Sequence, residues 1–301
     1  MHDIIIVGGG PAGMTAAIYA ARYRLDTIVI SGDIGGQIAK SHKICNFPSY
    51  PDIDGMTLSQ NMYKHVQSLD VPFIFDFVTG IEKKEDAFTV TTQSGKSYEG
   101  KKVIFTGGTE HRHLDVPGEK EFSGKGVSYC ATCDAAFFKD KKVAVIGGGD
   151  AAAKAALLLS EYAIDVYIIY RREKFFRAEP AWIDLIEKTM NIHTMFNEEI
   201  MAIEGDAFVN SITLKNAGKK LPVDGVFVEI GSVPKLEFIE NLCLEKEGAY
   251  LKTNNMQETN IKGFFAAGDV TSAPLRQIIT AAAQGSVAAF AAYTELTRES
   301  P

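Results

Sequence analysis

The same short pattern of strand, glycine-rich turn and helix occurs twice along the chain. The apolar run Ile4–Val7 leads into a turn with three consecutive glycines, and so does the run Lys142–Ile146. After each turn we expect a helix and then a second apolar strand, at Thr27–Ile30 and Val166–Tyr170. The predicted helices are Ala12–Arg22 and Ala151–Tyr162. Strand, turn, helix and strand form a βαβ unit with parallel strands and a right-handed crossover. The sequence therefore predicts an α/β fold with two Rossmann-like nucleotide-binding domains of three-layer ββα type.

Each copy also carries a predicted hairpin and a closing apolar strand. The hairpins join residues 88–92 to 97–98 and residues 211–214 to 220–221, and the closing strands are Val103–Thr106 and Val226–Ile230. After the second copy only a strand, Gly263–Ala267, and a helix, Leu275–Glu295, are predicted, too few for a third domain. We expect this tail to complete the first domain, which makes the second domain an insertion. The predicted domains are residues 1–112 with 244–301, and residues 113–243.

The composition limits the kinds of partner. The net charge of the 301 residues is −7, which argues against nucleic acid or an anionic membrane as partner. No apolar run is long enough to cross a bilayer, and the chain does not start with the pattern of a signal peptide. Only Cys130 and Cys133, of four cysteines, are close in sequence, unlike the disulfide framework of a secreted protein. We therefore expect a cytoplasmic protein.

The first glycine turn has the spacing of a dinucleotide-binding motif. Gly8 allows the tight turn, Gly10 lets the backbone approach a pyrophosphate, and Gly13 lets helix and strand pack closely. The helix N-terminus supplies N–H groups and the positive end of its dipole. An acidic residue for the ribose is expected at the end of the second strand, but Ser31 stands there and Asp33 lies nearby. The turn predicts a nucleotide site, although glycines also fill ordinary turns.

The second glycine turn predicts a nicotinamide nucleotide that carries a 2′-phosphate. It ends in Ala152 where the first turn has a glycine, and this substitution often accompanies NADP. The strand that follows ends without an acid and continues into Arg171 and Arg172, whose guanidinium groups suit a 2′-phosphate. Arg177 is a third candidate. The alternative is a solvated basic spot paired with Glu173.

The Cys130-Ala131-Thr132-Cys133 segment lies between the two glycine turns and has three interpretations. A structural zinc site needs two more ligands, but Cys45, Cys243 and His193 are isolated in the sequence. Two free structural thiols would leave the spacing unexplained. A redox couple of dithiol and disulfide explains it, and the carboxyl of Asp134 next to Cys133 can move the proton that a leaving thiolate needs. We favour the redox interpretation.

The segment after the Gly263–Ala267 strand is a second candidate for cofactor binding. Asp269 follows Gly268 at a predicted strand end, where a carboxylate can hold a polyol hydroxyl. The N-terminus of the following helix, near Arg276 and Gln277, can face the pyrimidine edge of a flavin, where negative charge develops on reduction. Alone, this segment would more often be a plain turn between strand and helix.

These motifs together resemble low-molecular-weight thioredoxin reductases along essentially the whole chain. The resemblance rests on matching segments that occur in the family's order and spacing: Gly8–Arg22, Gly35–Ile38, Asn46–Pro48, Gly118-Glu119, Gly126–Ser128, Cys130–Asp134, Val143–Gly149, Arg171-Arg172, Phe176–Ala178, Phe264–Val270 and Arg276-Gln277. It implies a homodimer that passes electrons from NADPH through FAD and a redox disulfide to thioredoxin or a thioredoxin-like protein. It also implies that Cys133 lies against the flavin, that Cys130 attacks thioredoxin, and that Asp134 is the acid and base.

The family pattern implies a set of binding residues for each cofactor and no metal. FAD would be bound by Gly8, Gly10, Pro11, Ala12, Gly13, Ser31, Gly32, Gly35, Gly36, Gln37, Ile38, Asn46, Gly107, Gly268, Asp269, Val270, Arg276, Gln277 and Ile278. NADPH would be bound by Gly147, Gly149, Asp150, Ala151, Ala152, Arg171, Arg172 and Arg177.

The sequence departs from the family around the nicotinamide nucleotide. Lys154 and Ala155 stand where acids are usual, and one extra residue separates Arg172 from Arg177. Ala135 and Ala136 follow Asp134 where glycine and aromatic residues are usual. Three alternatives stay open. They are a small-molecule dithiol oxidase of the same fold, a related flavin disulfide reductase that uses another electron donor, and a non-catalytic, zinc-stapled nucleotide-binding protein.

Overall fold

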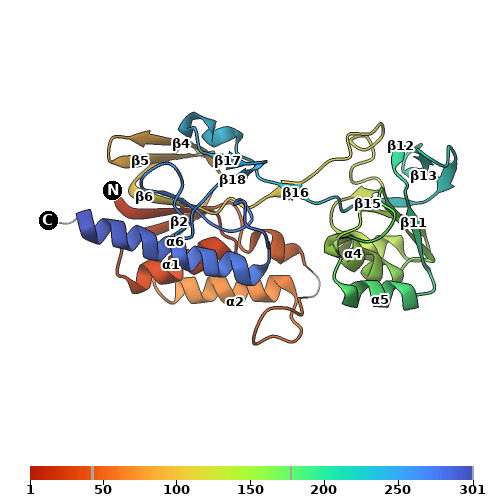
Figure 1. Ribbon diagram of the computed structural model, residues 1–301, viewed down its shortest axis with the longest axis horizontal. Coiled ribbons are helices and arrows are strands. Elements are labelled where there is room, and N and C mark those ends of the chain that lie inside the picture. Colours follow the sequence, from red (N-terminus) through yellow and green to blue (C-terminus); the bar gives the residue numbers. More distant parts are fainter. Residues whose placement is uncertain (42–43, 177, 300–301) are drawn as a thin grey trace. The chain divides into compact units, whose positions relative to one another are not determined.

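The computed structural model describes residues 1–41, 44–176 and 178–299 (Figure 1). The chain separates into two compact units, Met1–Glu110 with Val233–Pro301, and His111–Ser232. The second unit is inserted into the first, so the predicted α/β fold class with an inserted domain is confirmed. None of the helices in the described ranges is long and apolar enough to cross a membrane.

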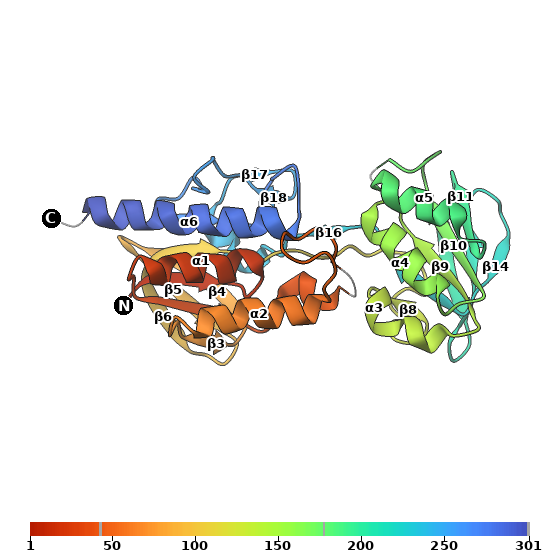
Figure 2. The same ribbon diagram turned by 90° about the horizontal axis from the view of Figure 1, so that it is seen from below.

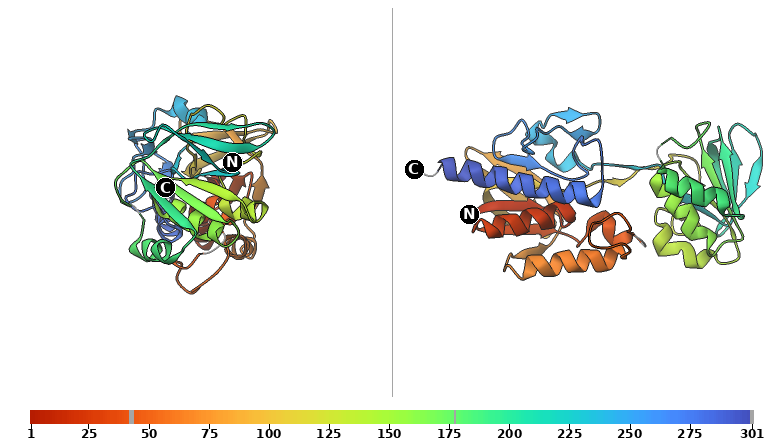
Figure 3. Two further views of the ribbon diagram at one scale, coloured as in Figure 1. Left: turned by 90° about the vertical axis from the view of Figure 1, so that its right-hand side faces the viewer. Right: turned by 60° about the horizontal axis from the view of Figure 1, so that its bottom comes forward.

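The first unit is built on a seven-stranded sheet with the order β3-β2-β1-β6-β5-β4, in which β19 also pairs with β6. Its strands are β1 (His2–Val7), β2 (Thr27–Ser31), β3 (Phe73–Phe75), β4 (Val78–Lys84), β5 (Ala87–Thr92), β6 (Ser97–Phe105) and β19 (Phe264–Ala266). Its helices are α1 (Pro11–Arg22), η1 (Gly36–Lys40), α2 (Gly55–Gln67), η3 (Glu237–Leu242) and α6 (Ile278–Glu299), and a small hairpin joins β17 (Lys246–Glu247) to β18 (Tyr250–Leu251). Figures 2 and 3 show α6, α1 and α2 side by side in one layer.

The central strands of this sheet are buried on both faces, as their unbroken apolar runs predict. Ile4 and Ile6 pack with α1 and α6, while Ile5 and Val7 point to the opposite cluster. The predicted strand Val103–Thr106 proves to be the end of the longer strand β6. Its first residues pair antiparallel with β5 and its last residues pair parallel with β1 and β19. The polar Lys102 concealed this continuity, since it is buried and ion-paired with Glu295 at 2.8 Å.

Helices α1 and α6 approach closely because Gly285 has no side chain. A Cβ atom on Gly285 would lie 2.0 Å from the carbonyl oxygen of Ala12. The helix α6 begins at Ile278, three residues later than predicted, after Gln277 donates its backbone N–H to the Thr280 hydroxyl at 3.0 Å.

We expect Gly285→Ala to destabilise the first unit. The added methyl group must separate the two helices, which lowers the free energy of unfolding by about 1–3 kcal/mol. Urea unfolding followed by circular dichroism measures this change. The matched control, Ala283→Ser on the exposed side of α6, should change the free energy much less, and equal changes in the two variants would show that the close contact is unimportant.

The second unit has three layers. A parallel sheet with the order β11-β10-β9-β15-β8 lies between a helical layer and a small antiparallel sheet, β12-β13-β14. The parallel strands are β8 (Val127–Ser128), β9 (Lys142–Ile146), β10 (Asp165–Tyr170), β11 (Ile192–Phe196) and β15 (Gly225–Val228), and the antiparallel strands are β12 (Ile200–Gly205), β13 (Val209–Leu214) and β14 (Lys220–Pro222). The helices are α3 (Ala131–Asp134), η2 (Ala135–Phe138), α4 (Asp150–Ser160) and α5 (Pro180–Lys188).

The predicted boundary between the domains after Cys243 is corrected to Ser232. Residues 233–243 return to the first unit, because Leu236, Ile239 and Leu242 around η3 pack into the core beneath its sheet. The chain passes from the first unit to the second at Glu110–His111 and returns at Ser232–Val233. These two segments pair with each other as the short strands β7 (Glu110–His111) and β16 (Ser232–Val233).

Candidate functional site

The first glycine turn leaves an open approach to the backbone at the start of α1. Gly8 has a φ of +112°, and a Cβ atom there would lie 2.3 Å from the Thr106 carbonyl oxygen. A Cβ atom on Gly13 would lie 1.9 Å from the Gly8 carbonyl oxygen, so both glycines are required by close packing. Gly10 differs, because a Cβ atom there would find its nearest neighbour, the Gly35 carbonyl oxygen, 4.0 Å away. The free space above Gly10 suits a pyrophosphate.

A second loop, after β2, lies against this turn. The Gly35 N–H donates to the Gly9 carbonyl oxygen at 2.7 Å, and a Cβ atom on Gly36 would lie 3.8 Å from the Cα of Gly10. Gln37 extends from η1 and donates its side-chain amide to the Thr109 carbonyl oxygen at 2.7 Å. Two predicted residues precede this loop, Ser31, which is buried at the end of β2, and Gly32, which lies under the ring of Phe77.

The start of α6 completes the predicted flavin site of the first unit. A Cβ atom on Gly268 would lie 3.0 Å from the Cβ of Ala12 in the first turn of α1. The Asn46 side chain donates to the Gln277 side-chain oxygen at 3.0 Å, which joins the loop after η1 to the start of α6. The structure therefore gathers these sequence-predicted residues, which are far apart in the chain, around one edge of the sheet.

Asp269 and Arg276 are the charged groups of this edge. Burial raises the pKa of the Asp269 carboxyl, and the positive charge of Arg276 partly offsets this effect. The Arg276 guanidinium lies 3.6 Å from the centre of the Tyr250 ring and donates to the Thr271 carbonyl oxygen, yet its Nε is buried without a partner among the described residues. A buried carboxyl and an unsatisfied guanidinium N–H fit the polar groups of FAD.

The remaining predicted FAD residues differ in which of their atoms can contact a cofactor. Pro11 and Ala12 form the first turn of α1, and Gly107 follows β6. The side chains of Ile38 and Val270 are buried in apolar clusters, and Ile278 packs against the cluster of Ile38, so Ile38 and Val270 can meet a cofactor only through their backbone.

The second glycine turn has the same close packing at the end of β9. Gly147 has a φ of +150°, and a Cβ atom there would lie 2.2 Å from the Glu229 carbonyl oxygen. Gly149 is extended and precedes α4, whose first turn contains Asp150, Ala151 and the fully buried Ala152. The Asp150 carboxylate accepts the N–H of Glu179 at 2.7 Å. It therefore holds the segment before α5, a structural role that the sequence did not predict.

The predicted 2′-phosphate residues lie beyond β10. Arg171 and Arg172 are exposed, and Arg172 stacks on the Phe176 ring with 4.9 Å to its centre. The ion pairs found among the described residues involve neither Arg171, Arg172 nor Glu173, so the charges of both arginines are available to a phosphate. Arg177 lies outside the described residues. Lys154, at a position where the family usually has an acid, lies 5.1 Å from the centre of the Trp182 ring.

Cys130 and Cys133 form a disulfide across the short helix α3. Their Cα atoms are 5.3 Å apart. Cys130 precedes the helix, and the N–H of Cys133 lies 3.2 Å from the Cys130 sulfur. Cys133 is exposed, while Cys130 and Asp134 are half-buried. Cys45 and Cys243 are free and exposed. Nowhere in the part of the chain that the structure describes do three His, Cys, Asp or Glu side chains gather as metal ligands would.

A partly buried network of side chains that includes Tyr129, the residue before Cys130, was not predicted from the sequence. The Tyr129 hydroxyl donates to Glu119 at 2.7 Å, and Nδ1 of His113 lies 2.9 Å from the same hydroxyl. Burial favours a higher pKa for Glu119, but hydrogen bonds from Leu114, Tyr129 and Asp115 outweigh it and hold that pKa below its usual range. Burial and the Glu119 carboxylate raise the pKa of Tyr129. The network ties the start of the second unit to the residue before Cys130.

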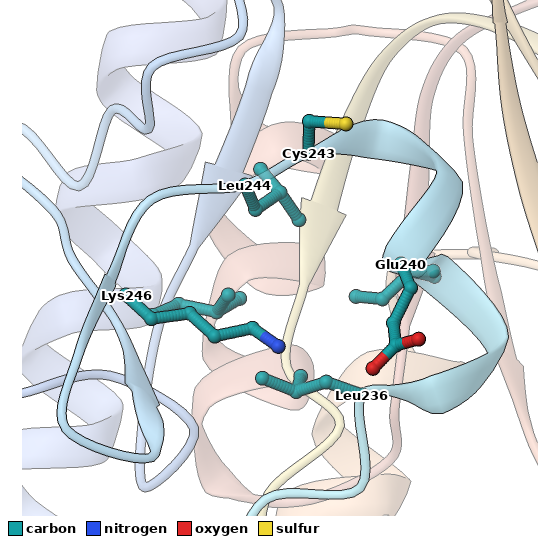
Figure 4. A pocket seen from close by; sticks show the side chains of 7 residues that line it. Leu236, Glu240, Cys243, Leu244 and Lys246 are labelled. Atoms are coloured by element: carbon teal, nitrogen blue, oxygen red, sulfur yellow. The ribbon is translucent and has the colours of Figure 1, made fainter.

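A cavity of about 300 Å³ in the first unit lies apart from the predicted site residues. It is lined by η3 and the hairpin that follows, and Figure 4 shows Glu240 and Lys246 reaching toward the same space. None of its lining residues belongs to the predicted cofactor set.

Comparison with known proteins decides the family. Residues 2–285 match the family model described as pyridine nucleotide-disulphide oxidoreductase. The chain is 38% identical to the thioredoxin reductase of Bacillus subtilis over 296 residues, which cover 96% of this chain and 93% of the relative. The chain belongs to the thioredoxin reductase family. The resemblance inferred from the motifs is therefore confirmed.

Other members of the thioredoxin reductase family support this assignment. The enzyme of Treponema pallidum is 40% identical over 297 residues, covering 97% of this chain and 96% of the relative. The crystal structure of Lactococcus lactis thioredoxin reductase matches with a TM-score of 0.96 and 37% identity, covering 99% of this chain and all of the other. The family uses FAD and NADPH, which agrees with the two glycine turns of this chain.

Proposed function

We propose that the protein is an NADPH-dependent, FAD-containing thioredoxin-disulfide reductase. The observation that carries the proposal is the Cys130–Cys133 disulfide, placed on a nucleotide-binding unit and inserted between the parts of a second one. FAD, when bound, supplies the chemistry that accepts a hydride from NADPH and delivers two electrons to a disulfide. Zinc binds cysteine as thiolate, and the sulfurs of Cys130 and Cys133 are instead bonded to each other.

The thiol chemistry follows from the local geometry of α3. Two electrons and two protons convert the Cys130–Cys133 disulfide to a dithiol. Once reduced, the Cys130 sulfur is the better placed to carry negative charge, because the Cys133 N–H points to it. A Cys130 thiolate attacks a disulfide of the partner and forms a mixed disulfide, which Cys133 then resolves to release the partner as a dithiol. We assign the exchange of the proton to Asp134, which follows Cys133 in α3.

We assign the sequence-predicted residues of the first unit to FAD and those of the second to NADPH. The open space above Gly10, the unsatisfied Arg276 Nε and the buried Asp269 support the first assignment. The paired, exposed guanidinium groups of Arg171 and Arg172 support the second. The partner is thioredoxin or a thioredoxin-like protein, as the names of the relatives suggest, and we place the reaction in the cytoplasm, where such thiols stay reduced.

We also propose a homodimer. The outer sides of α1 and α6 carry an aromatic cluster, in which Tyr23 stacks on Tyr293 at 4.6 Å and Tyr19 and Phe290 are 41% and 47% exposed. Exposed aromatic side chains in a cluster are typical of interfaces. Light scattering of the purified protein tests this, and a monomeric mass at micromolar concentration would contradict it.

We expect Gly10→Ala to prevent FAD binding without unfolding the protein. The new methyl group has room in the free structure but would occupy the space above the turn, where the pyrophosphate must approach. The purified variant should be colourless, with a circular dichroism spectrum like that of the parent. Gly80→Ala is the control, because a Cβ atom on Gly80 meets nothing within 4 Å and Gly80 lies in β4, away from the turn. A yellow Gly10→Ala protein with full FAD content would exclude this site.

A further inference from the structure

Glu229 occupies the point in the second unit where a doubly wound sheet binds its ligand. The strand order β11-β10-β9-β15-β8 reverses direction between β9 and β15. Ligands of such sheets bind outside the carboxyl ends of the strands at this reversal. Gly147 directly follows β9, and Glu229 directly follows β15. By sequence alone, Glu229 is only one residue of the predicted apolar strand Val226–Ile230.

The backbone fixes Glu229 beside the second glycine turn. Its N–H donates to the Ile146 carbonyl oxygen at 2.8 Å, so the ladder between β9 and β15 continues through this residue. Its own carbonyl oxygen is the atom that a Cβ on Gly147 would meet at 2.2 Å. Glu229 and the turn that is predicted to cradle the dinucleotide are therefore immediate neighbours.

The side chain of Glu229 is expected on the helical face of the sheet. Val226 and Val228 belong to the apolar cluster shared with β12 and β13, and Phe227 belongs to the cluster shared with α3 and α4. Side chains alternate along a strand. The next residue, Glu229, therefore points to the side on which α4 begins after the glycine turn.

The carboxyl of Glu229 has no compensating partner among the described residues. Burial raises its pKa to about 7, and no charge or hydrogen bond opposes this effect. Asp150 on α4 is engaged with the Glu179 N–H and Lys154 with the Trp182 ring. Buried groups with displaced pKa values concentrate at functional sites.

We propose that Glu229 is a binding residue of the dinucleotide site. Its protonated carboxyl binds a polar group of the nicotinamide nucleotide, so that binding takes up one proton. This inference rests on the proposed use of NADPH. The pyrophosphate, held at the N-terminus of α4, repels a Glu229 carboxylate, whereas a neutral carboxyl can both donate to and accept from sugar hydroxyls or the carboxamide.

The direction of the pH dependence follows from this coupling. Below about pH 7 the carboxyl is already protonated in the free protein, and the affinity does not depend on it. Above this pH the Glu229 carboxylate must take up a proton from solution whenever NADP⁺ binds. The dissociation constant of NADP⁺ therefore rises about tenfold per pH unit. At about pH 8 the 2′-phosphate, with its pKa near 6, is fully ionised and does not contribute.

Isothermal titration calorimetry of the FAD-loaded protein with NADP⁺, which supports no turnover, tests the proposal. Titrations at about pH 8 in two buffers with different heats of ionisation give the number of protons taken up. The parent should take up close to one proton per NADP⁺, and Glu229→Gln, which cannot ionise, should take up none and keep a constant affinity from about pH 7 to 9. Glu187→Gln, an exposed substitution on α5, is the matched control and should behave like the parent.

Two results overturn the inference in distinguishable ways. NADP⁺ binding by the parent without proton uptake, or equal uptake by parent and Glu229→Gln, leaves the donor assignment intact but removes the role of Glu229. A parent protein that binds no NADP⁺ refutes the donor assignment and this inference together. If Glu229→Gln does not fold, the proton uptake and pH slope of the parent decide.

Discussion

Cys133→Ser and Cys130→Ser proteins are expected to lose thioredoxin reduction completely while NADPH still bleaches their flavin. Hydride transfer to FAD precedes the thiol steps and needs neither sulfur, whereas every later electron must pass through the Cys130–Cys133 pair. Turnover with thioredoxin should fall to background, a loss of several orders of magnitude. Stopped-flow absorbance of the flavin and a steady-state assay of thioredoxin thiols measure the two halves separately.

The two other cysteines provide matched controls for this experiment. Cys45→Ser and Cys243→Ser alter free, exposed thiols and should leave both half-reactions unchanged. Substantial thioredoxin turnover by Cys130→Ser or Cys133→Ser would contradict the dithiol mechanism. A parent protein that instead consumes oxygen with small dithiols and ignores thioredoxin would favour the dithiol oxidase alternative.

Removal of both charges in Arg171→Ala/Arg172→Ala is expected to raise the KM for NADPH about 100-fold. Each charge-assisted contact with the 2′-phosphate contributes about 1.5 kcal/mol at such exposed positions, near the lower end of the usual range. The KM for NADH, which lacks this phosphate, should hardly change. Initial rates of flavin-dependent turnover with each nucleotide give both constants.

Lys219→Ala is the control for the arginine variant, since Lys219 is an exposed cation of the same unit on the loop between β13 and β14. It should leave the KM values for both nucleotides near those of the parent. If the double arginine variant also treats NADPH and NADH as the parent does, Arg171 and Arg172 are only surface charges, and the donor site must be sought elsewhere.

Local patterns in the sequence were sufficient for the parts of the fold that depend on neighbouring residues. Both βαβ units occur as predicted, because an apolar strand, a glycine turn and a helix are encoded within about 30 residues. The strand β9, Lys142–Ile146, has the predicted bounds. The gathering of the first glycine turn, the loop after β2 and the start of α6 also agrees with the family pattern.

Features that depend on tertiary contacts were missed. Lys102 interrupts the apolar pattern of β6, and only its burial against Glu295 shows why a strand can contain it. The segment that ends at Cys243 looked like part of the inserted domain, but three buried side chains around η3 return it to the first unit. Such assignments depend on residues far away in the sequence, which local patterns do not contain.

The polar groups near the candidate sites were the least predictable. The family pattern implies an NADPH-binding role for Asp150, which stays a prediction, but it does not reveal that the Asp150 carboxylate accepts the Glu179 N–H. The Tyr129 hydroxyl hydrogen-bonds to Glu119 and lies within hydrogen-bond distance of His113. These residues are 10 and 16 positions from Tyr129 in the sequence, so no local pattern reveals the contacts. For Glu229 the sequence does contain one indication of a special role, because it is an acidic residue at the end of an otherwise apolar strand.

Anaerobic titration of the parent protein with NADPH, followed by a thiol count, tests the central claim most directly. The FAD and the Cys130–Cys133 disulfide each accept two electrons, so the account predicts that about two equivalents of NADPH are oxidised per chain. The flavin should be bleached, and the number of reactive thiols should rise from the two free cysteines to all four. Failure of NADPH to bleach the flavin, or bleaching after one equivalent with no new thiols, would contradict it.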